Sequence, residues 1–429
     1  MVIQALVAVP RTRTNATLIG SRPADSSIVA NNLRFLLRSS NSDRRFLREV
    51  NVTKTEWSNL KTIRPAPADL PRSLLNYIDY RKSGLSLNHI VGCPLDCGYC
   101  VRHLFDNFSM KRPHLIVDDE IAVQELVGHW AFRAHTTPIQ IFNRATDPFL
   151  PGVKTHLFRS LEALDGRGFR NPVLVITRWK IEPSDVDRLE ALTNLKLTIL
   201  VTWSGIDDDR VEPVSSAIAV GSLEVLANSA SRVKKILYWR PIISGLNDTN
   251  DHFASARRLS EFADATVFTG LFYREEIRAY FREAGVPDLY ADVARRKILP
   301  RDAERRILSH FEGRPIFRKT SCGVAFAHGV PDFNGHFGIR EICDICPEAQ
   351  HEICGRKHHR PDMEVVRSLA RVVSLADLDG IEISDRRIEV SGSSEAQRYF
   401  MQHALNFQVH DRAQPHRQHR HGRAEIGWE

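Results

Sequence analysis

Six short apolar segments alternate with helix-like segments over the middle of this 429-residue chain, and no other feature constrains the fold as strongly. Parallel strands need crossover helices, so the alternation predicts an α/β fold with a parallel sheet. A doubly wound sheet and a partial barrel both satisfy this pattern. The apolar segments are Leu85–Val91, Pro138–Asn143, Pro172–Thr177, Leu197–Trp203, Lys235–Arg240 and Thr266–Leu271. The helix-like segments include Asp118–Ala131, Pro183–Leu192, Asp251–Ala263 and Arg274–Ala284.

Three cysteines, Cys93, Cys97 and Cys100, follow the first predicted strand in a C-x3-C-x2-C segment. Both candidate architectures place active sites at the carboxyl ends of their strands, where this segment lies. Closed zinc sites and ferredoxin-type clusters use four protein ligands, one more than the loop supplies. A four-iron cluster on three thiolates would keep one iron open for chemistry. The alternative is a zinc knuckle completed by a distant His or Cys.

With Tyr99 before its last cysteine, this loop resembles the signature of the radical S-adenosylmethionine (radical SAM) superfamily. The resemblance implies a 4Fe–4S cluster on Cys93, Cys97 and Cys100, whose open iron binds the amino and carboxylate groups of SAM. It also implies an external electron donor of the flavodoxin or ferredoxin type, and release of a 5′-deoxyadenosyl radical. The fold that it implies is a partial (β/α)6 TIM-like barrel.

Segments that follow the later strands resemble those of spore photoproduct lyase-like members of that superfamily. Their order implies a set of SAM-binding residues, with Lys180 as an alternative to Arg178. This set is Tyr99, Asn143, Thr146, Asp147, Arg178, Ser204 and Arg240. One departure is the absence of any cysteine between Cys100 and Cys322, because such lyases carry a hydrogen-donating cysteine near the position of Ala145. Repair of a thymine photoproduct by that route is therefore not expected.

A second group of cysteines, Cys322, Cys343, Cys346 and Cys354, supplies four thiols within 33 residues. The C-x15-G-x4-C spacing around Gly338 resembles the opening of SPASM and twitch auxiliary domains, although the later spacing departs from the SPASM pattern. Four thiolates can bind either a second 4Fe–4S cluster or zinc, and both remain open. Nearby histidines could support such a metal or lie on the surface.

Composition sets broad limits on the class of protein. The net charge of +7 permits a polyanionic partner, and no apolar run is long enough to span a membrane. Cysteines in two spaced groups favour metal ligation in a reducing compartment, so we expect a cytoplasmic protein. The expected regions are an irregular N-terminal arm (1–83), the barrel (84–311), a small Cys-rich metal-cluster domain (312–362) and an α+β segment with a basic, His-rich tail (363–429).

These features predict a radical SAM iron–sulfur enzyme that abstracts a hydrogen atom from a bulky substrate. Nucleic acid, in a modification or repair reaction, is the favoured substrate because of the positive charge and the lyase-like barrel. A peptide- or protein-modifying enzyme with an auxiliary cluster is the alternative. A more remote alternative is a non-catalytic metal protein that binds nucleic acid, which would never consume SAM.

Overall fold

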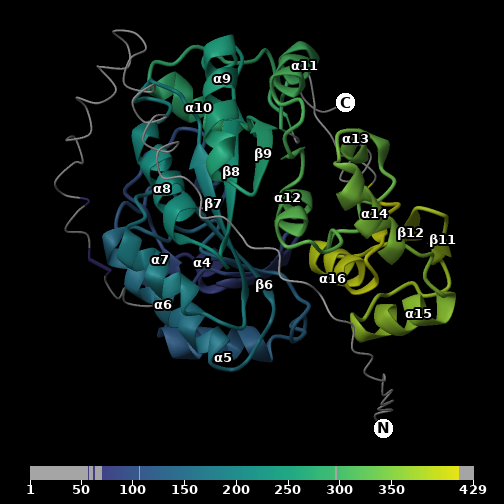
Figure 1. Ribbon diagram of the computed structural model, residues 1–429. Coiled ribbons are helices and arrows are strands. Elements are labelled where there is room, and N and C mark those ends of the chain that lie inside the picture. Colours follow the sequence, from purple (N-terminus) through teal and green to yellow (C-terminus); the bar gives the residue numbers. More distant parts are fainter. Residues whose placement is uncertain (1–56, 58–60, 63–69, 106, 295–296, 415–429) are drawn as a thin grey trace, which may run out of the picture. The chain divides into compact units, whose positions relative to one another are not determined.

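The computed structural model describes residues 57, 61–62, 70–105, 107–294 and 297–414. Most of the expected N-terminal arm and the tail beyond residue 414 lie outside these ranges. The described part contains an eight-stranded sheet, helices around it, and a smaller C-terminal portion that follows the last strand of the sheet (Figure 1). No helix of this part is long and apolar enough to cross a membrane.

The large sheet has the order β1-β2-β5-β6-β7-β8-β9-β10. Every neighbouring pair is parallel except β1 and β2, which form an antiparallel hairpin at one edge. The prediction of an α/β protein is confirmed, and the mostly parallel sheet is consistent with a partial barrel. The strands are β1 (Ile78–Arg81), β2 (Gly84–Leu87), β5 (Ile139–Ile141), β6 (Pro172–Thr177), β7 (Lys196–Trp203), β8 (Lys234–Ile242), β9 (Ala265–Gly270) and β10 (Ile316–Phe317).

Helices connect the successive parallel strands, and local sequence signals mark where several of them begin. Pro151 starts α6, because proline at the first helical position lacks only a donor that would be unpaired there. The side chains of Ser215 and Thr249 cap the first turns of α8 and α9. The helices are α4 (Arg72–Leu75), α5 (Asp119–Gly128), α6 (Pro151–Asp165), α7 (Pro183–Glu190), α8 (Ser216–Ser229), α9 (Asn250–Leu259), α10 (Glu275–Glu283) and α11 (Arg301–His310), with short 3-10 helices at Val101–Leu104 and Ser260–Phe262.

The start of the sheet differs from the sequence prediction. The expected strand Leu85–Val91 is two elements, β2 and β3 (Ile90–Val91), and β3 pairs with β4 (His114–Leu115) in a separate two-stranded sheet. Polar Asn88 and His89 separate the two apolar stretches, so the cysteine loop follows β3 and not a strand of the large sheet. The large sheet also extends past the expected barrel limits of 84 and 311, because β1 and β10 belong to it.

The C-terminal portion is more regular than the sequence suggests. Residues 320–360, within the expected Cys-rich domain, form three helices. The α+β segment that follows contains two further helices and a small sheet, in which β12 pairs antiparallel with β11 and parallel with β13. These elements are α12 (Thr320–Ala327), α13 (Arg340–Cys343), α14 (Glu348–Lys357), α15 (Met363–Val372), β11 (Glu382–Ile383), β12 (Arg387–Val390), α16 (Glu395–Leu405) and β13 (Gln408–Asp411).

Buried apolar side chains lie on both faces of the large sheet, as expected for parallel strands. One face carries Leu174, Leu200 and Ile236, which pack with Cys322 and Val324 of α12 in one apolar cluster. Alternate residues of the same strands belong to the larger core with the surrounding helices. The sheet therefore connects the region of the first cysteine loop with that of the second cysteine group.

Candidate functional site

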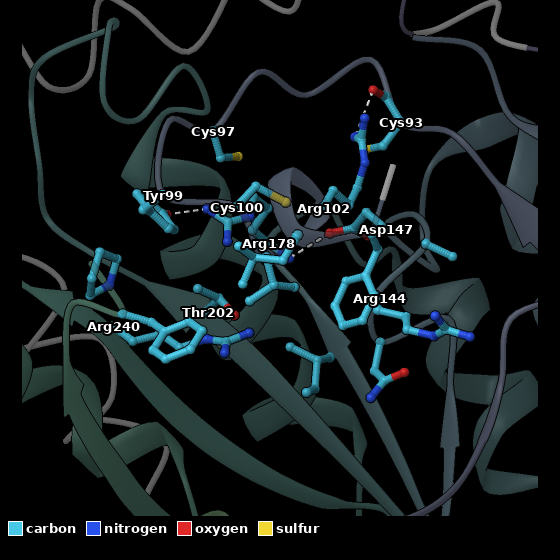
Figure 2. A pocket seen from close by; sticks show the side chains of 18 of the residues that line it. Cys93, Cys97, Tyr99, Cys100, Arg102, Arg144, Asp147, Arg178, Thr202 and Arg240 are labelled. Atoms are coloured by element: carbon cyan, nitrogen blue, oxygen red, sulfur yellow. Dashed lines mark hydrogen bonds between the residues drawn. The ribbon is translucent and has the colours of Figure 1, made fainter. Parts of the chain in front are cut away.

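A cavity of about 620 Å³ lies at the carboxyl ends of the parallel strands, and all three cysteines of the first loop line it. Its wall continues through the residues that follow β5, β6 and β9 and through residues near the carboxyl ends of β7 and β8. Figure 2 shows the three cysteines facing the same space as Asp147, Arg178 and Arg240. The volume lies within the range of pockets that bind cofactors and small molecules.

The cysteine loop is held in place by backbone contacts. Gly92 before it has φ +103°, and a Cβ there would lie 2.1 Å from the carbonyl oxygen of Arg112, so only glycine fits. The guanidinium of Arg102 donates to the carbonyl oxygens of Cys93 at 2.9 Å and Phe108 at 2.7 Å. These contacts fix the loop beside the cavity, and the Arg102 side chain that makes them also lines its wall.

The three thiols fit an iron–sulfur cluster better than a structural role as free cysteines. Burial raises the pKa of Cys93 and Cys97, so without a metal both would stay protonated. A coordinated metal stabilises the thiolates, and the adjoining cavity has room for a cluster and a further ligand. The alternative of a zinc knuckle needs a fourth Cys or His from elsewhere, and the described cavity wall contains no such residue.

Glu212, which the sequence analysis did not select, is the centre of a buried network behind the loop. It accepts hydrogen bonds from the hydroxyl of Tyr99 and from Arg178, whose Nη1 lies 2.8 Å from Oε2. The hydroxyl of Ser204 also donates to Glu212, at 3.2 Å, and Ser204 does not line the cavity. Arg178, expected to bind SAM, thus has a carboxylate of the protein as its partner, while its side chain still lines the cavity.

The residues after β5 form another part of the wall. The carboxylate of Asp147 accepts hydrogen bonds from the Thr177 hydroxyl at 2.7 Å and from the Arg178 amide at 2.8 Å, which ties this loop to the end of β6. Asn143 bonds through its amide to Gln140. The hydroxyl of Thr146 is buried and has no hydrogen-bond partner among the described residues, so it is available to a ligand.

Positive charge dominates the cavity. Among the described residues of the wall, only Asp147 and Glu276 carry a carboxylate. Lys180, the alternative to Arg178, is exposed beside Glu182 and lies outside the wall. Lys297 was missed because it comes from a loop far along the chain, and burial lowers its pKa. The cationic residues of the wall are Arg81, Arg102, Arg144, Arg178, Arg240, Arg274 and Lys297.

Tyr238 lies among these charges on the cavity wall. Its hydroxyl is 3.0 Å from Oγ1 of Thr320, and the guanidinium carbon of Arg240 is 4.0 Å from the centre of its ring. Burial raises the pKa of Tyr238, but the charges of Arg240 and Lys297 and the bond with Thr320 outweigh burial and lower it to about 8.

We therefore expect one tyrosine to ionise near pH 8 in the folded protein, where an ordinary tyrosine has a pKa of 10.0. A pH titration of tyrosinate absorbance in the near ultraviolet measures this. The step should disappear in Tyr238→Phe and move to higher pH in Arg240→Gln, because the cation favours the phenolate. A Tyr238→Phe variant that keeps the step would contradict the assignment.

The second group of cysteines also comes together, around a small cavity of about 20 Å³. Cys322 belongs to α12, Cys343 ends α13, Cys346 follows it and Cys354 lies in α14. Their wall also includes Asp332 and His336, which the sequence analysis did not select, as well as His351. His358, another histidine near the second group of cysteines, stacks on Phe407, with the ring centres 5.1 Å apart.

The sheet, the cation-lined cavity and the three-thiol loop define an α/β protein with a candidate metal centre at the carboxyl ends of its strands. Its structure is similar to a spore photoproduct lyase variant, with 13% identity, 58% of this chain and 80% of that chain covered, and a TM-score of 0.41. It is also similar to the radical S-adenosylmethionine methyltransferase TsrM from Kitasatospora setae, with 13% identity, 45% of this chain and 37% of that chain covered, and a TM-score of 0.32. A third similar structure is SuiB from Streptococcus suis, with 12% identity, 70% of this chain and 61% of that chain covered, and a TM-score of 0.34.

No protein-family profile matches the chain, and no curated protein matches it. At TM-scores below one half, the structural similarities carry no argument about activity.

Proposed function

We propose that this protein is a radical SAM enzyme. The observation that carries the proposal is the position of the Cys93, Cys97 and Cys100 loop, which faces a 620 Å³ cavity at the carboxyl ends of the parallel strands. These three residues would hold a 4Fe–4S cluster. When bound and reduced by an external donor, the cluster would supply the electron that cleaves SAM to methionine and a 5′-deoxyadenosyl radical.

The side chains of the wall would bind and orient SAM. Thr146 offers a buried hydroxyl with no partner among the described residues, and Arg240 offers a guanidinium that lies over Tyr238. Asn143 and Asp147 are the other candidates after β5, and Arg178 is held at the end of β6 by Glu212. Because the carboxylate of Asp147 and the guanidinium of Arg178 are already hydrogen-bonded within the protein, the cavity would bind SAM in a preorganised shape.

Nucleic acid is the substrate class that the charge of the cavity favours. Seven cationic side chains and two carboxylates line the wall, and the chain carries a net charge of +7. Phosphate groups bind such surfaces by releasing counterions, whereas an uncharged peptide would gain nothing from them. A peptide or protein substrate remains the alternative, and the second cysteine group is the feature that favours it.

A salt titration separates the two substrate classes. Arg81 and Arg274 line the cavity and form no salt bridge within the described residues, although each lies over a phenylalanine ring. We expect the Arg81→Ala, Arg274→Ala double variant to bind a labelled single-stranded oligonucleotide more weakly. Its slope of log affinity against log salt should be smaller by about 1.4, since each lost contact with a single strand removes about 0.7.

Lys180→Ala is the matched control, because this lysine is exposed and lies outside the cavity. Fluorescence anisotropy over a range of salt concentrations gives the slopes. Equal slopes in the double variant, the control and the unchanged protein would contradict a nucleic-acid site in the cavity. Absence of binding by all three proteins would favour a peptide or protein substrate.

A further inference from the structure

Cys322, Asp332 and His336 form a compact set of metal-ligating side chains away from the first loop. Their ligand atoms all lie within 4.8 Å of one another. Among the described residues, this is the one group of three or more His, Cys, Asp or Glu side chains whose ligand atoms lie so close together. The thiol of Cys322 is 3.9 Å from Nδ1 of His336, and this nitrogen is 3.0 Å from Oδ2 of Asp332. All three residues are buried, with at most 8% of any one exposed.

The loop that carries Asp332 and His336 is fixed from both sides. Gly335 has φ +63°, and a Cβ there would lie 2.6 Å from the backbone of Asn406, so the loop lies directly against the segment between α16 and β13. Gln408 donates to the carbonyl oxygen of Asn334 at 2.6 Å. The amide of His336 donates to Asp332 at 3.0 Å. The packing and hydrogen bonds of this loop therefore hold His336 beside α12.

A carboxylate, an imidazole and a thiol gathered in an apolar layer are costly to bury unless they bind something. The neighbours of Cys322 on α12 pack against Leu200 and Ile236 of the sheet. The carboxylate of Asp332 and the thiols of Cys343, Cys346 and Cys354 line the same small cavity. A divalent cation would offset this charge and stabilise the thiolate, which is the ordinary reason for such a set of donors.

The size and the chemistry of this site both favour a single ion. A cavity of about 20 Å³ accommodates one water-sized body, whereas a 4Fe–4S core adds eight atoms. Sulfur, nitrogen and oxygen ligands together suit Zn²⁺, while iron–sulfur clusters are held chiefly by thiolates.

We propose that Cys322, His336 and Asp332 bind one structural Zn²⁺ ion, with its fourth ligand from the thiols of Cys343, Cys346 or Cys354 across the same cavity. The ion joins α12, which packs on the sheet, to the loop that α16 and β13 hold. It thereby stabilises the position of the C-terminal portion against the sheet. This inference concerns the second cysteine group alone, and the proposed radical chemistry at Cys93 does not depend on it.

Metal analysis of a variant without the first loop thiols tests the proposal. In full-length protein with Cys93, Cys97 and Cys100 all replaced by serine, any iron must belong to the second group. After anaerobic reconstitution with iron and sulfide, we expect about one zinc and almost no iron per chain. X-ray absorption at the zinc edge should show sulfur at about 2.3 Å together with nitrogen or oxygen at about 2.0–2.1 Å.

Variants at two histidines supply the comparison. His336→Ala should lose zinc to a chelator at least tenfold faster, and His336→Cys should retain zinc with more sulfur in its first shell. His351→Ala, at another histidine of the same cavity wall, should retain zinc like the parent. About four irons with matching sulfide, or a zinc shell of sulfur alone in the parent, would overturn the proposal whatever the fold of the variants. Production of 5′-deoxyadenosine by the unchanged protein tests the proposed function separately.

Discussion

Replacing Cys97 with alanine is expected to remove the iron of the first loop and to abolish 5′-deoxyadenosine formation from SAM. The unchanged protein, reconstituted anaerobically and reduced with dithionite, should hold about four irons and one zinc per chain. Three thiolates leave one of the four irons without a protein ligand, and with only two a second iron loses its ligand and the cluster is no longer held. We expect the rate to fall by at least about a thousandfold, since no side chain of the cavity can deliver an electron to SAM in place of the cluster.

Cys343→Ala is the matched control, because it removes a thiol of the second group and leaves the first loop intact. It should keep about four irons and form 5′-deoxyadenosine at close to the parent rate. Iron, sulfide and zinc are measured in the unchanged protein, in Cys97→Ala and in Cys343→Ala, and 5′-deoxyadenosine is measured by chromatography in all three. Zinc alone, with SAM untouched in the unchanged protein, would refute the radical SAM assignment and favour the non-catalytic alternative. About eight irons in the unchanged protein would keep the radical chemistry and refute the zinc proposal.

Replacing Glu212 with alanine should produce the largest loss of stability among single changes at the site. The side chain of Glu212 is 4% exposed and that of Arg178 is 15% exposed, so the change leaves a nearly buried guanidinium without its carboxylate. It also removes the acceptor for Tyr99. Breaking a buried ion pair by removing one partner costs about 3–5 kcal/mol in the free energy of unfolding.

Denaturant unfolding of parent and variants gives the measurement. The double variant Arg178→Met, Glu212→Leu should recover most of the loss, because no charge is then left unpaired. Arg188→Ala breaks an exposed pair with Glu162 and should cost less than about 1 kcal/mol. If Glu212→Ala were no more costly than Arg188→Ala, the network would not support the loop. If the double variant were as unstable as Glu212→Ala, the loss would come from packing and not from the charge.

The fold was accessible from sequence because its signals are local and repeated. The alternation of apolar and amphipathic segments indicates which segments form buried strands and which form helices, so the six central strands and the parallel sheet could be predicted. The ends of the sheet could not. The hairpin strand β1 and the two-residue β10 are too short to carry a pattern, and their place depends on hydrogen bonds to strands distant in the sequence.

The candidate site divides in the same way. The spacing of Cys93, Cys97 and Cys100 predicted the thiol loop, and the resemblance to radical SAM proteins implied Asp147 and Arg240, which line the same cavity. Their proposed contacts with SAM remain predictions. The sequence alone thus determined the sheet, the thiol loop and the edge at which they meet. Only the tertiary structure decided that Glu212 pairs with Arg178, that Lys297 reaches the cavity and that His336 lies beside Cys322. Each of these is a single residue in a loop, and the path of a loop is set by packing against distant segments, which leaves no periodic trace in the chain.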